Sequence, residues 1–287
     1  MRSALFGASG LLGKALSREW SGDELVLLGS RDADIRDAAA VERVVERAKA
    51  DWIILAAAYT DVDGCESDRE RAFSVNRDGA VNVARAARRV GSKLLFLSSD
   101  YVFDGKKSSP YEVDDPRNPQ SVYGRSKAEA EVALMEALPE CCVVRTSWLF
   151  GVGGKCFPDT ILRLAASRDS LDVVDDQRGS PTYTVDLARA IVQLCRADAS
   201  GIVHVTNRGD CSWFEFARFI LREAGMETET KPVSTAQFPR PAPRPGYSVL
   251  SAKSLERFQI MTPPWQDAGR RYLRERGLFD LRLLSRR

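Results

Sequence analysis

The sequence predicts a doubly wound α/β fold, in which helices cover both faces of a parallel sheet. Short apolar runs alternate with amphipathic stretches through the first half of the chain, as in repeated strand–helix units. A glycine-rich turn follows the first apolar run directly. The 287 residues are enough for one large domain and a smaller lobe. We therefore expect a sheet domain over residues 1–150 and a second lobe over 151–287, with some later segments returning to the sheet.

Five apolar runs in the first half are expected to form the strands, and four amphipathic stretches between them the helices. The strands are Ser3–Phe6, Leu25–Leu28, Trp52–Leu55, Leu94–Leu97 and Val143–Arg145. The helices are at about 11–20, 38–50, 69–90 and 123–138. Crossovers between parallel strands are nearly always right-handed, so the expected form is doubly wound.

The pattern loosens after Gly151. Helices are expected near 157–166 and 185–196, with a strand at Leu171–Val174 between them. Ser212 is a plausible N-cap for a following helix, and a last helix at 265–276 should end at Gly277. The proline-rich stretch 238–245 is too short for a domain linker and is expected to be a loop.

Composition excludes several functional classes. The 42 basic residues nearly balance the 40 acidic ones, which gives no support to a nucleic-acid or membrane partner. The absence of a long apolar run argues against a membrane span. None of the six cysteines forms a CxxC pair, so they are expected to be reduced thiols in a cytoplasmic protein. The single histidine, His204, lies in a strand-like run and is expected to be a packed or edge-strand residue rather than a catalytic base.

The glycine-rich turn, Gly7–Gly13, predicts a dinucleotide site of the Rossmann type. Its glycines follow the spacing GxxGxxG and lie between the first strand and the first helix. Glycines let the backbone approach a pyrophosphate, and the helix N-terminus offers unpaired N–H groups to it. The expected contacts are Gly7, Ser9, Gly10, Leu11, Leu12 and Gly13.

The end of the second strand favours NADPH, with NADH as the alternative. An NAD-selective fold places an acidic residue there, whereas this chain has Ser30 and Arg31. A serine and an arginine suit a 2′-phosphate, because guanidinium presents a fork of donors. Asp34 and Ile35 are expected to flank the adenine.

Small residues after the third strand leave room for the cofactor's ribose and pyrophosphate. The contacts expected there are Ala56, Ala57, Ala58, Tyr59 and Thr60, and Asn76 completes the cofactor set.

Three residues predict the chemistry, which is proton transfer to a carbonyl during hydride transfer. Tyr123 and Lys127 are four residues apart, so one helix face can present both to a cleft. A nearby ammonium is expected to lower the pKa of the tyrosine, which then serves as the acid. Ser99 ends an apolar strand, where its hydroxyl can hold the substrate carbonyl.

With these motifs, the chain resembles the dTDP-4-dehydrorhamnose reductase family, a branch of the extended short-chain dehydrogenases. The resemblance covers almost the whole chain, and the joined motifs S-S-D-Y-V-F and Y-G-R-S-K carry it most specifically. Further matching segments are 56–63, 145–151, 176–182 and 242–245. The resemblance implies NADPH-dependent reduction of the 4-keto group of dTDP-4-dehydro-L-rhamnose to dTDP-L-rhamnose, with Ser99, Tyr123 and Lys127 as the catalytic set.

By position, the resemblance also implies substrate contacts at Ser99, Asp100 and Trp148, with the indole as an apolar wall for the deoxysugar. Charge and loop position make Arg244 the candidate for the substrate diphosphate. Some family members are described as binding magnesium at a dimer contact. The chain has no matching carboxylate cluster, so no metal site is expected, while a homodimer remains open.

Two rival functions remain open. One is a ketoreductase for another nucleotide-linked deoxysugar, because motifs do not report the sugar epimer or the base. The other is a non-catalytic regulatory subunit resembling the beta subunit of methionine adenosyltransferase, which keeps the dinucleotide fold. Retention of Ser99, Tyr123 and Lys127 favours an enzyme.

Overall fold

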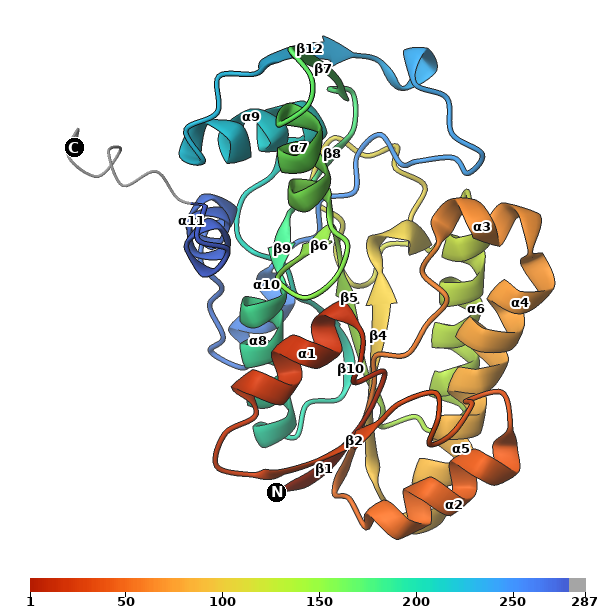
Figure 1. Ribbon diagram of the computed structural model, residues 1–287. Helices are drawn as coiled ribbons and strands as arrows, with labels where there is room; N and C mark the ends of the chain where they lie inside the picture. The colour runs from red at the N-terminus through yellow and green to blue at the C-terminus, as the bar shows by residue number, and fades with distance from the viewer. Residues whose placement is uncertain (279–287) are drawn as a thin grey trace.

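Six parallel strands form the central sheet, in the order β10-β5-β4-β3-β1-β2 (Figure 1). The computed structural model describes residues 1–278. The strands are β1 (Arg2–Phe6), β2 (Glu24–Leu28), β3 (Trp52–Leu55), β4 (Lys93–Ser99), β5 (Cys142–Thr146) and β10 (Gly201–His204). The predicted fold class is confirmed, and all five strands expected in the first half are present.

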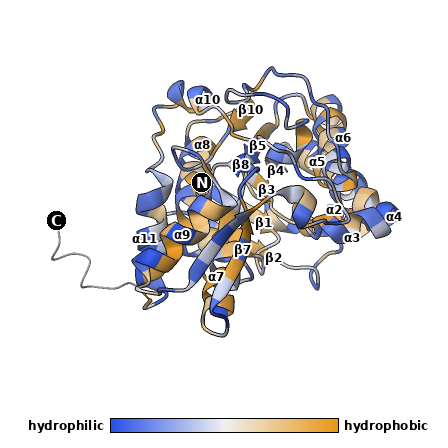
Figure 2. Ribbon diagram, turned by 90° about the horizontal axis from the view of Figure 1, so that it is seen from above, coloured by the Kyte–Doolittle hydropathy of each residue, from blue (hydrophilic) through white to orange (hydrophobic). Residues whose placement is uncertain are grey.

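Helices cover both faces of this sheet. Because side chains alternate along a strand, Leu5 packs with α1 (Leu11–Glu19) and α8 (Thr184–Arg196) on one face. Its neighbour Phe6 packs on the other face, among three further helices. These are α2 (Ala38–Ala48), α5 (Gly79–Val90) and α6 (Val122–Ala137). Figure 2 shows hydrophobic residues concentrated in the central strands, between helices that carry hydrophilic residues as well.

The helix expected over 69–90 is broken into shorter pieces. The segment contains α4 (Arg69–Phe73), a π-helical turn (Ser74–Asp78) and α5, and the unpredicted α3 (Val62–Ser67) precedes it. Asp68 begins α4, because its carboxylate accepts a hydrogen bond from Arg71 N at 3.1 Å. The apolar periodicity runs across these breaks, so it predicted one long helix where the chain forms several pieces.

The second half forms a smaller lobe with its own core, in which α7 (Phe157–Ala165), α9 (Trp213–Glu223) and α11 (Trp265–Glu275) pack together. Short strands connect these helices. They are β6 (Leu149–Phe150) with β9 (Thr182–Tyr183), β8 (Arg178–Gly179) with β11 (Cys211–Ser212), and β7 (Ser170–Val174) with β12 (Glu229–Val233). Ser212 caps α9 as expected, in a reciprocal pair with Glu215. In the described part of the chain, no helix is both long and apolar enough to cross a membrane.

Three elements of the second half join the central sheet or pack beside it: β10 pairs with β5 at the sheet edge, α8 packs on α1, and α10 (Lys253–Glu256) packs beside β10. His204 lies on β10 and is buried, as expected of an edge-strand histidine. Burial, together with the nearby Arg145 guanidinium, lowers the pKa of His204 to about 4. The imidazole is therefore neutral at physiological pH.

A buried ion pair fixes α6 to the sheet. The Glu131 carboxylate on α6 accepts hydrogen bonds from Arg145 Nε at 2.9 Å and Nη2 at 2.7 Å. The same carboxylate accepts from Ser98 Oγ on β4 at 2.5 Å and from Arg117 Nε at 2.7 Å. Both members of the pair are almost fully buried. Glu131 therefore ties one helix to two neighbouring strands.

We expect Glu131→Gln to lower the free energy of unfolding by about 3 kcal/mol, because it leaves a buried guanidinium without its counter-charge. Glu129→Gln, on the exposed face of the same helix, removes an ion pair with Arg77 and should cost less than about 1 kcal/mol. Urea denaturation followed by circular dichroism measures both. Equal losses would contradict the role given to the buried pair.

Candidate active site

A cleft of about 660 Å³ opens at the carboxyl ends of the central strands, where open α/β sheets bind ligands. Most of the residues expected from the sequence line it. From the cofactor set these are Gly7, Ser9, Gly10, Leu11, Leu12, Gly13, Ser30, Asp34, Ile35, Ala56, Ala57, Ala58 and Thr60. From the catalytic and substrate sets they are Ser99, Asp100, Tyr123, Lys127 and Trp148. Arg31, Tyr59, Asn76 and Arg244 do not line it.

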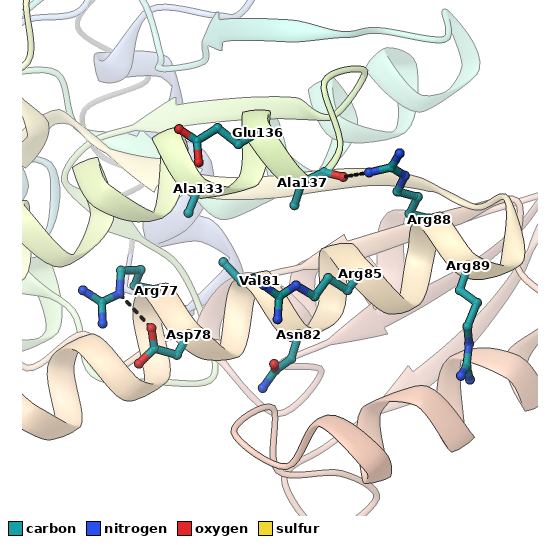
Figure 3. Close-up of a pocket in the computed structure, with 10 residues that line it drawn as sticks. All are labelled: Arg77, Asp78, Val81, Asn82, Arg85, Arg88, Arg89, Ala133, Glu136 and Ala137. Carbon is teal, nitrogen blue, oxygen red and sulfur yellow. Dashed lines mark hydrogen bonds and ion pairs between the residues drawn. The ribbon is translucent and has the colours of Figure 1, made fainter.

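A second groove, of about 940 Å³, runs between α5 and α6 on the outer surface (Figure 3). None of the residues expected from the sequence lines it. Two of its basic side chains are engaged within the groove: Arg77 Nε donates to Asp78 at 2.7 Å, and Arg88 donates to the Ala137 carbonyl at 3.2 Å. The cleft at the sheet edge is therefore the candidate active site.

Two glycines of the glycine-rich turn, Gly7 and Gly13, have no room for a side chain. Gly7 has a φ of 90°, and a Cβ there would lie 2.6 Å from Ala57 N. A Cβ on Gly13 would lie 2.2 Å from the Gly7 carbonyl oxygen. The turn, β3 and the first turn of α1 are thus packed backbone to backbone. This cradle leaves the N-terminus of α1 open to the cleft for a phosphate group.

After β2, the arginine that was expected to bind the cofactor, Arg31, lies outside the lining of the cleft. Another arginine, Arg36, was not expected there and lies within the lining. Ser30 lines the cleft, whereas the neighbouring Arg31 is exposed outside it. Arg36 lines the cleft and donates to the Asp34 carboxylate, through Nε at 3.0 Å and Nη2 at 2.6 Å. These hydrogen bonds lower the pKa of Asp34. This ion pair could have been predicted from the sequence, because Asp34 and Arg36 are only two residues apart.

Asn76 and Tyr59 lie outside the lining of the cleft and stabilise the loop that follows β3. Tyr59 N donates to Asn76 Oδ1 at 2.7 Å, and Asn76 Nδ2 donates to the Tyr59 carbonyl at 3.0 Å. Asn76 Nδ2 also donates to Ser126 Oγ at 2.9 Å. The Tyr59 ring packs against the guanidinium of Arg71, which lines the cleft. Asn76 thus ties the strand-end loop to α6.

The hydroxyl, phenol and ammonium groups of the catalytic set lie together in the cleft. Tyr123 and Lys127 occupy the first two turns of α6, which Ser121 caps by accepting from Gly124 N at 3.1 Å. Ser99 ends β4, and its hydroxyl lies near enough to the Tyr123 phenol to influence the pKa of that group. Ser99 Oγ also donates to Asp100 Oδ1 at 2.9 Å.

Burial sets the protonation of this group in a way that differs from the sequence-based expectation. Burial raises the pKa of Tyr123, and the Ser99 hydroxyl only partly offsets the rise. Burial also lowers the pKa of Lys127 to about 7, opposed by the Glu131 carboxylate. The Lys127 ammonium lies 4.0 Å from the centre of the Phe96 ring, in an apolar setting. The protein's own groups therefore keep the Tyr123 phenol protonated at neutral pH, the state that an acid requires.

Arg244 is engaged at the edge of the second lobe. Its Nη2 donates to Asp63 Oδ1 at 3.0 Å, and Arg240 binds the other oxygen of the same carboxylate at 2.6 Å. The loop of residues 238–245 is thereby attached to α3. The Arg244 guanidinium also donates to the Ala242 carbonyl through Nη1 at 3.0 Å.

Sequence reasoning missed further residues of the lining. Thr146 ends β5, lines the cleft and is 5% exposed, and its Oγ1 has no hydrogen-bond partner among the described residues. The signal was the one used for Ser99, a polar residue that ends an apolar strand. Lys155 also lines the cleft, from the loop between β6 and α7. Within residues 1–278, no three His, Cys, Asp or Glu side chains are grouped closely enough to hold a metal ion.

Ionisation of the buried Asp100 carboxyl lowers the stability of the fold, so this stability depends on pH. Burial raises the pKa of this carboxyl to about 6, although the Ser248 and Ser99 hydroxyls oppose the shift. An acid whose pKa is higher in the folded state destabilises the fold once it ionises, so the cost appears as the pH rises from about 4 through 6.

We expect Asp100→Asn to remove this cost. We compare the free energy of unfolding of this variant with that of the parent chain at each pH. The difference in favour of the variant should be about 2 kcal/mol larger at about pH 8 than at about pH 4.5. Urea denaturation at the two pH values measures the difference. A pH-independent difference would show that the buried carboxyl does not carry this cost.

Comparisons with known proteins agree with this geometry. The family model described as the RmlD substrate binding domain matches residues 1–277. The chain is 46% identical over 261 residues to dTDP-4-dehydrorhamnose reductase of Mycobacterium tuberculosis, covering 88% of this chain and 85% of that one. It is 40% identical over 273 residues to the spore coat polysaccharide biosynthesis protein SpsK of Bacillus subtilis, covering 94% and 96%.

Solved structures give the same picture. The dTDP-4-dehydrorhamnose reductase of Clostridium acetobutylicum has a TM-score of 0.94 at 38% identity, covering 96% of this chain and 100% of that one. The Bacillus anthracis enzyme, solved in complex with NADP, has a TM-score of 0.93 at 38% identity, covering 96% and 99%. Since the sequence and structural matches extend over nearly the whole chain, it belongs to the dTDP-4-dehydrorhamnose reductase family.

Proposed function

We propose that the protein reduces the 4-keto group of dTDP-4-dehydro-L-rhamnose to give dTDP-L-rhamnose, with NADPH as the reductant. The observation that carries the proposal is the meeting of Ser99, Tyr123 and Lys127 in the cleft that also contains the glycine-rich turn. The relatives named dTDP-4-dehydrorhamnose reductase support the choice of substrate. This assignment places the chain in nucleotide-sugar biosynthesis.

The cleft fits a dinucleotide. The glycines at Gly7, Gly10 and Gly13 carry no side chain that could obstruct a pyrophosphate, and the N-terminus of α1 lines the same cleft. Asp34 and Ile35 would flank the adenine, with Ala56–Thr60 beside the ribose. The NADP in the Bacillus anthracis relative supports NADPH over NADH. When bound, NADPH supplies the hydride that goes to the carbonyl carbon of the sugar.

The chain's own residues handle the proton. The Tyr123 phenol gives its proton to the sugar oxygen as the negative charge develops there. The Ser99 hydroxyl donates to Asp100 Oδ1 in the structure, and it would turn from that carboxylate to donate to the substrate oxygen and fix its position. The Lys127 ammonium stabilises the phenolate that remains and would hold the ribose of the nicotinamide. The apolar surroundings of Lys127 strengthen both interactions.

We assign residues 1–150 mainly to cofactor binding and 151–287 mainly to substrate binding, with α8 and β10 returning to the sheet. Trp148 would form an apolar wall for the deoxysugar, and Arg244 would bind the diphosphate through guanidinium N–H groups that do not bond Asp63. All six cysteines are buried free thiols, which supports a reducing cytoplasmic setting. A homodimer remains a prediction.

A ketoreductase for a different deoxysugar is the second candidate. The chain is 39% identical over 257 residues to a probable dTDP-4,6-dihydroxy-2-methyloxan-3-one 4-ketoreductase of Streptomyces antibioticus, covering 87% and 86%. Catalysis of either reaction would exclude the purely regulatory alternative.

The test is consumption of NADPH in the presence of dTDP-4-dehydro-L-rhamnose, followed by absorbance, with the product identified by NMR. We expect turnover to dTDP-L-rhamnose. Turnover only with another keto-sugar nucleotide would favour the second candidate. No turnover with any of them would overturn the enzymatic assignment.

Tyr123→Phe should reduce turnover at least about 100-fold, because the proton donor is lost while the ring remains. Its affinity for NADPH, measured by fluorescence titration, should stay at the level of the parent chain. Normal turnover by this variant would show that another group donates the proton.

Arg31→Ala should weaken NADPH binding about tenfold and leave NADH binding nearly unchanged, because a charged hydrogen bond to the 2′-phosphate is lost. Arg31 has no ion pair among residues 1–278, whereas Arg36 is neutralised by Asp34. Arg36→Ala is therefore the matched control and should have the smaller effect on NADPH. Equal weakening of both cofactors by Arg31→Ala would remove the 2′-phosphate contact.

A further inference from the structure

Trp148 holds an unusual backbone conformation at the wall of the cleft. Its φ is 47°, in the left-handed region that bulky residues rarely adopt. Its carbonyl accepts a hydrogen bond from Thr182 N at 3.1 Å, next to the pairing of Leu149 with Thr182. A strained conformation persists only where the surroundings hold it, and such residues concentrate at functional sites.

One support is Trp213, the first residue of α9 in the second lobe. The two indoles stack with ring centroids 3.4 Å apart and planes at 5°. Trp213 is itself fixed, because its Nε1 donates to Gln177 Oε1 at 3.2 Å and Phe157 packs 4.5 Å away. Trp148 lines the cleft, whereas Trp213 does not.

The other support is Gly179 in β8, because the Trp148 indole occupies the space that a side chain at this position would fill. A Cβ on this glycine would lie 2.4 Å from Cε2 and 2.6 Å from Nε1 of Trp148. The φ of Gly179 is not in the left-handed region, so the backbone itself would accept alanine. Glycine is therefore needed at this position for the room that it leaves to the indole, and not for its backbone conformation.

We propose that Trp213 and Gly179 are positioning residues that hold the Trp148 indole between them, as an apolar wall whose free edge faces the sugar ring of the substrate. The proposal rests on the proposed function, since it takes a nucleotide-linked deoxysugar as the ligand. The indole offers the deoxysugar an apolar surface. A hydroxyl placed against the same wall would lose its water without gaining a partner. The stack therefore sets both affinity and preference for the deoxysugar.

The first experiment compares substitutions at Trp213. Trp213→Ala should raise KM for dTDP-4-dehydro-L-rhamnose about tenfold, while the affinity for NADPH stays unchanged because the glycine-rich turn is untouched. Trp213→Phe keeps a flat ring and should restore most of the loss. A merely structural role would impair substrate and NADPH binding together. That result, or an unchanged KM in Trp213→Ala, would overturn the proposal.

The second experiment reaches the same indole from its other side. Gly179→Ala should displace Trp148 and raise KM by a similar factor. Gly246→Ala is the matched control, because its nearest neighbours lie 3.7 Å from the added Cβ and its carbonyl bonds the adjacent Arg178 N. We expect the control to behave like the parent chain. Equal effects of both glycine substitutions would overturn the proposal.

A crystal structure of Trp213→Ala separates this inference from the proposed function. If the parent chain fails to reduce the keto-sugar, the proposed function fails, while the positioning of Trp148 can still be read directly. We expect Trp148 to leave the left-handed region and its indole to turn away from Gly179. An unchanged Trp148 would overturn the inference.

Discussion

The buried ion pair between Glu131 and Arg145 is the interaction on which the cleft depends. Tyr123, Lys127 and Glu131 follow one another at intervals of four residues, so they share one face of α6. Glu131 joins that face to Ser98 on β4 and to Arg145 on β5. Ser99, the next residue of β4, is therefore held at a fixed place relative to the phenol and the ammonium. The helix and the strand end form one rigid unit.

The same burial governs the chemistry of the site. Away from water, the Tyr123 phenol keeps its proton and the Lys127 ammonium releases its proton more easily. The Asp100 carboxyl is raised in pKa for the same reason. Each of these groups lowers the stability of the fold when it is charged. The Glu131 carboxylate, neutralised by two guanidiniums, partly offsets this cost by favouring the charged form of Lys127.

Features that depend on local pattern could be predicted from the sequence. The strands, the glycine-rich turn and the meeting of Ser99 with Tyr123 followed from apolar runs and from the rule that parallel strands end at one edge. Features that depend on tertiary packing could not. The direction of the pKa shift at Tyr123 comes from burial, and the pairing of Arg244 with Asp63 joins residues far apart in the chain. The left-handed backbone conformation of Trp148 could not be predicted from the sequence, because tryptophan is not a residue type that favours it.

The central claim is that this cleft directs a hydride to the 4-keto carbon while Tyr123 supplies the proton. Isotope transfer tests it most directly, with NADPH deuterated at the reactive carbon of the nicotinamide and dTDP-4-dehydro-L-rhamnose in a single turnover. The account predicts dTDP-L-rhamnose with deuterium at the fourth carbon of the sugar, as seen by NMR. A product formed without deuterium at that carbon would contradict it.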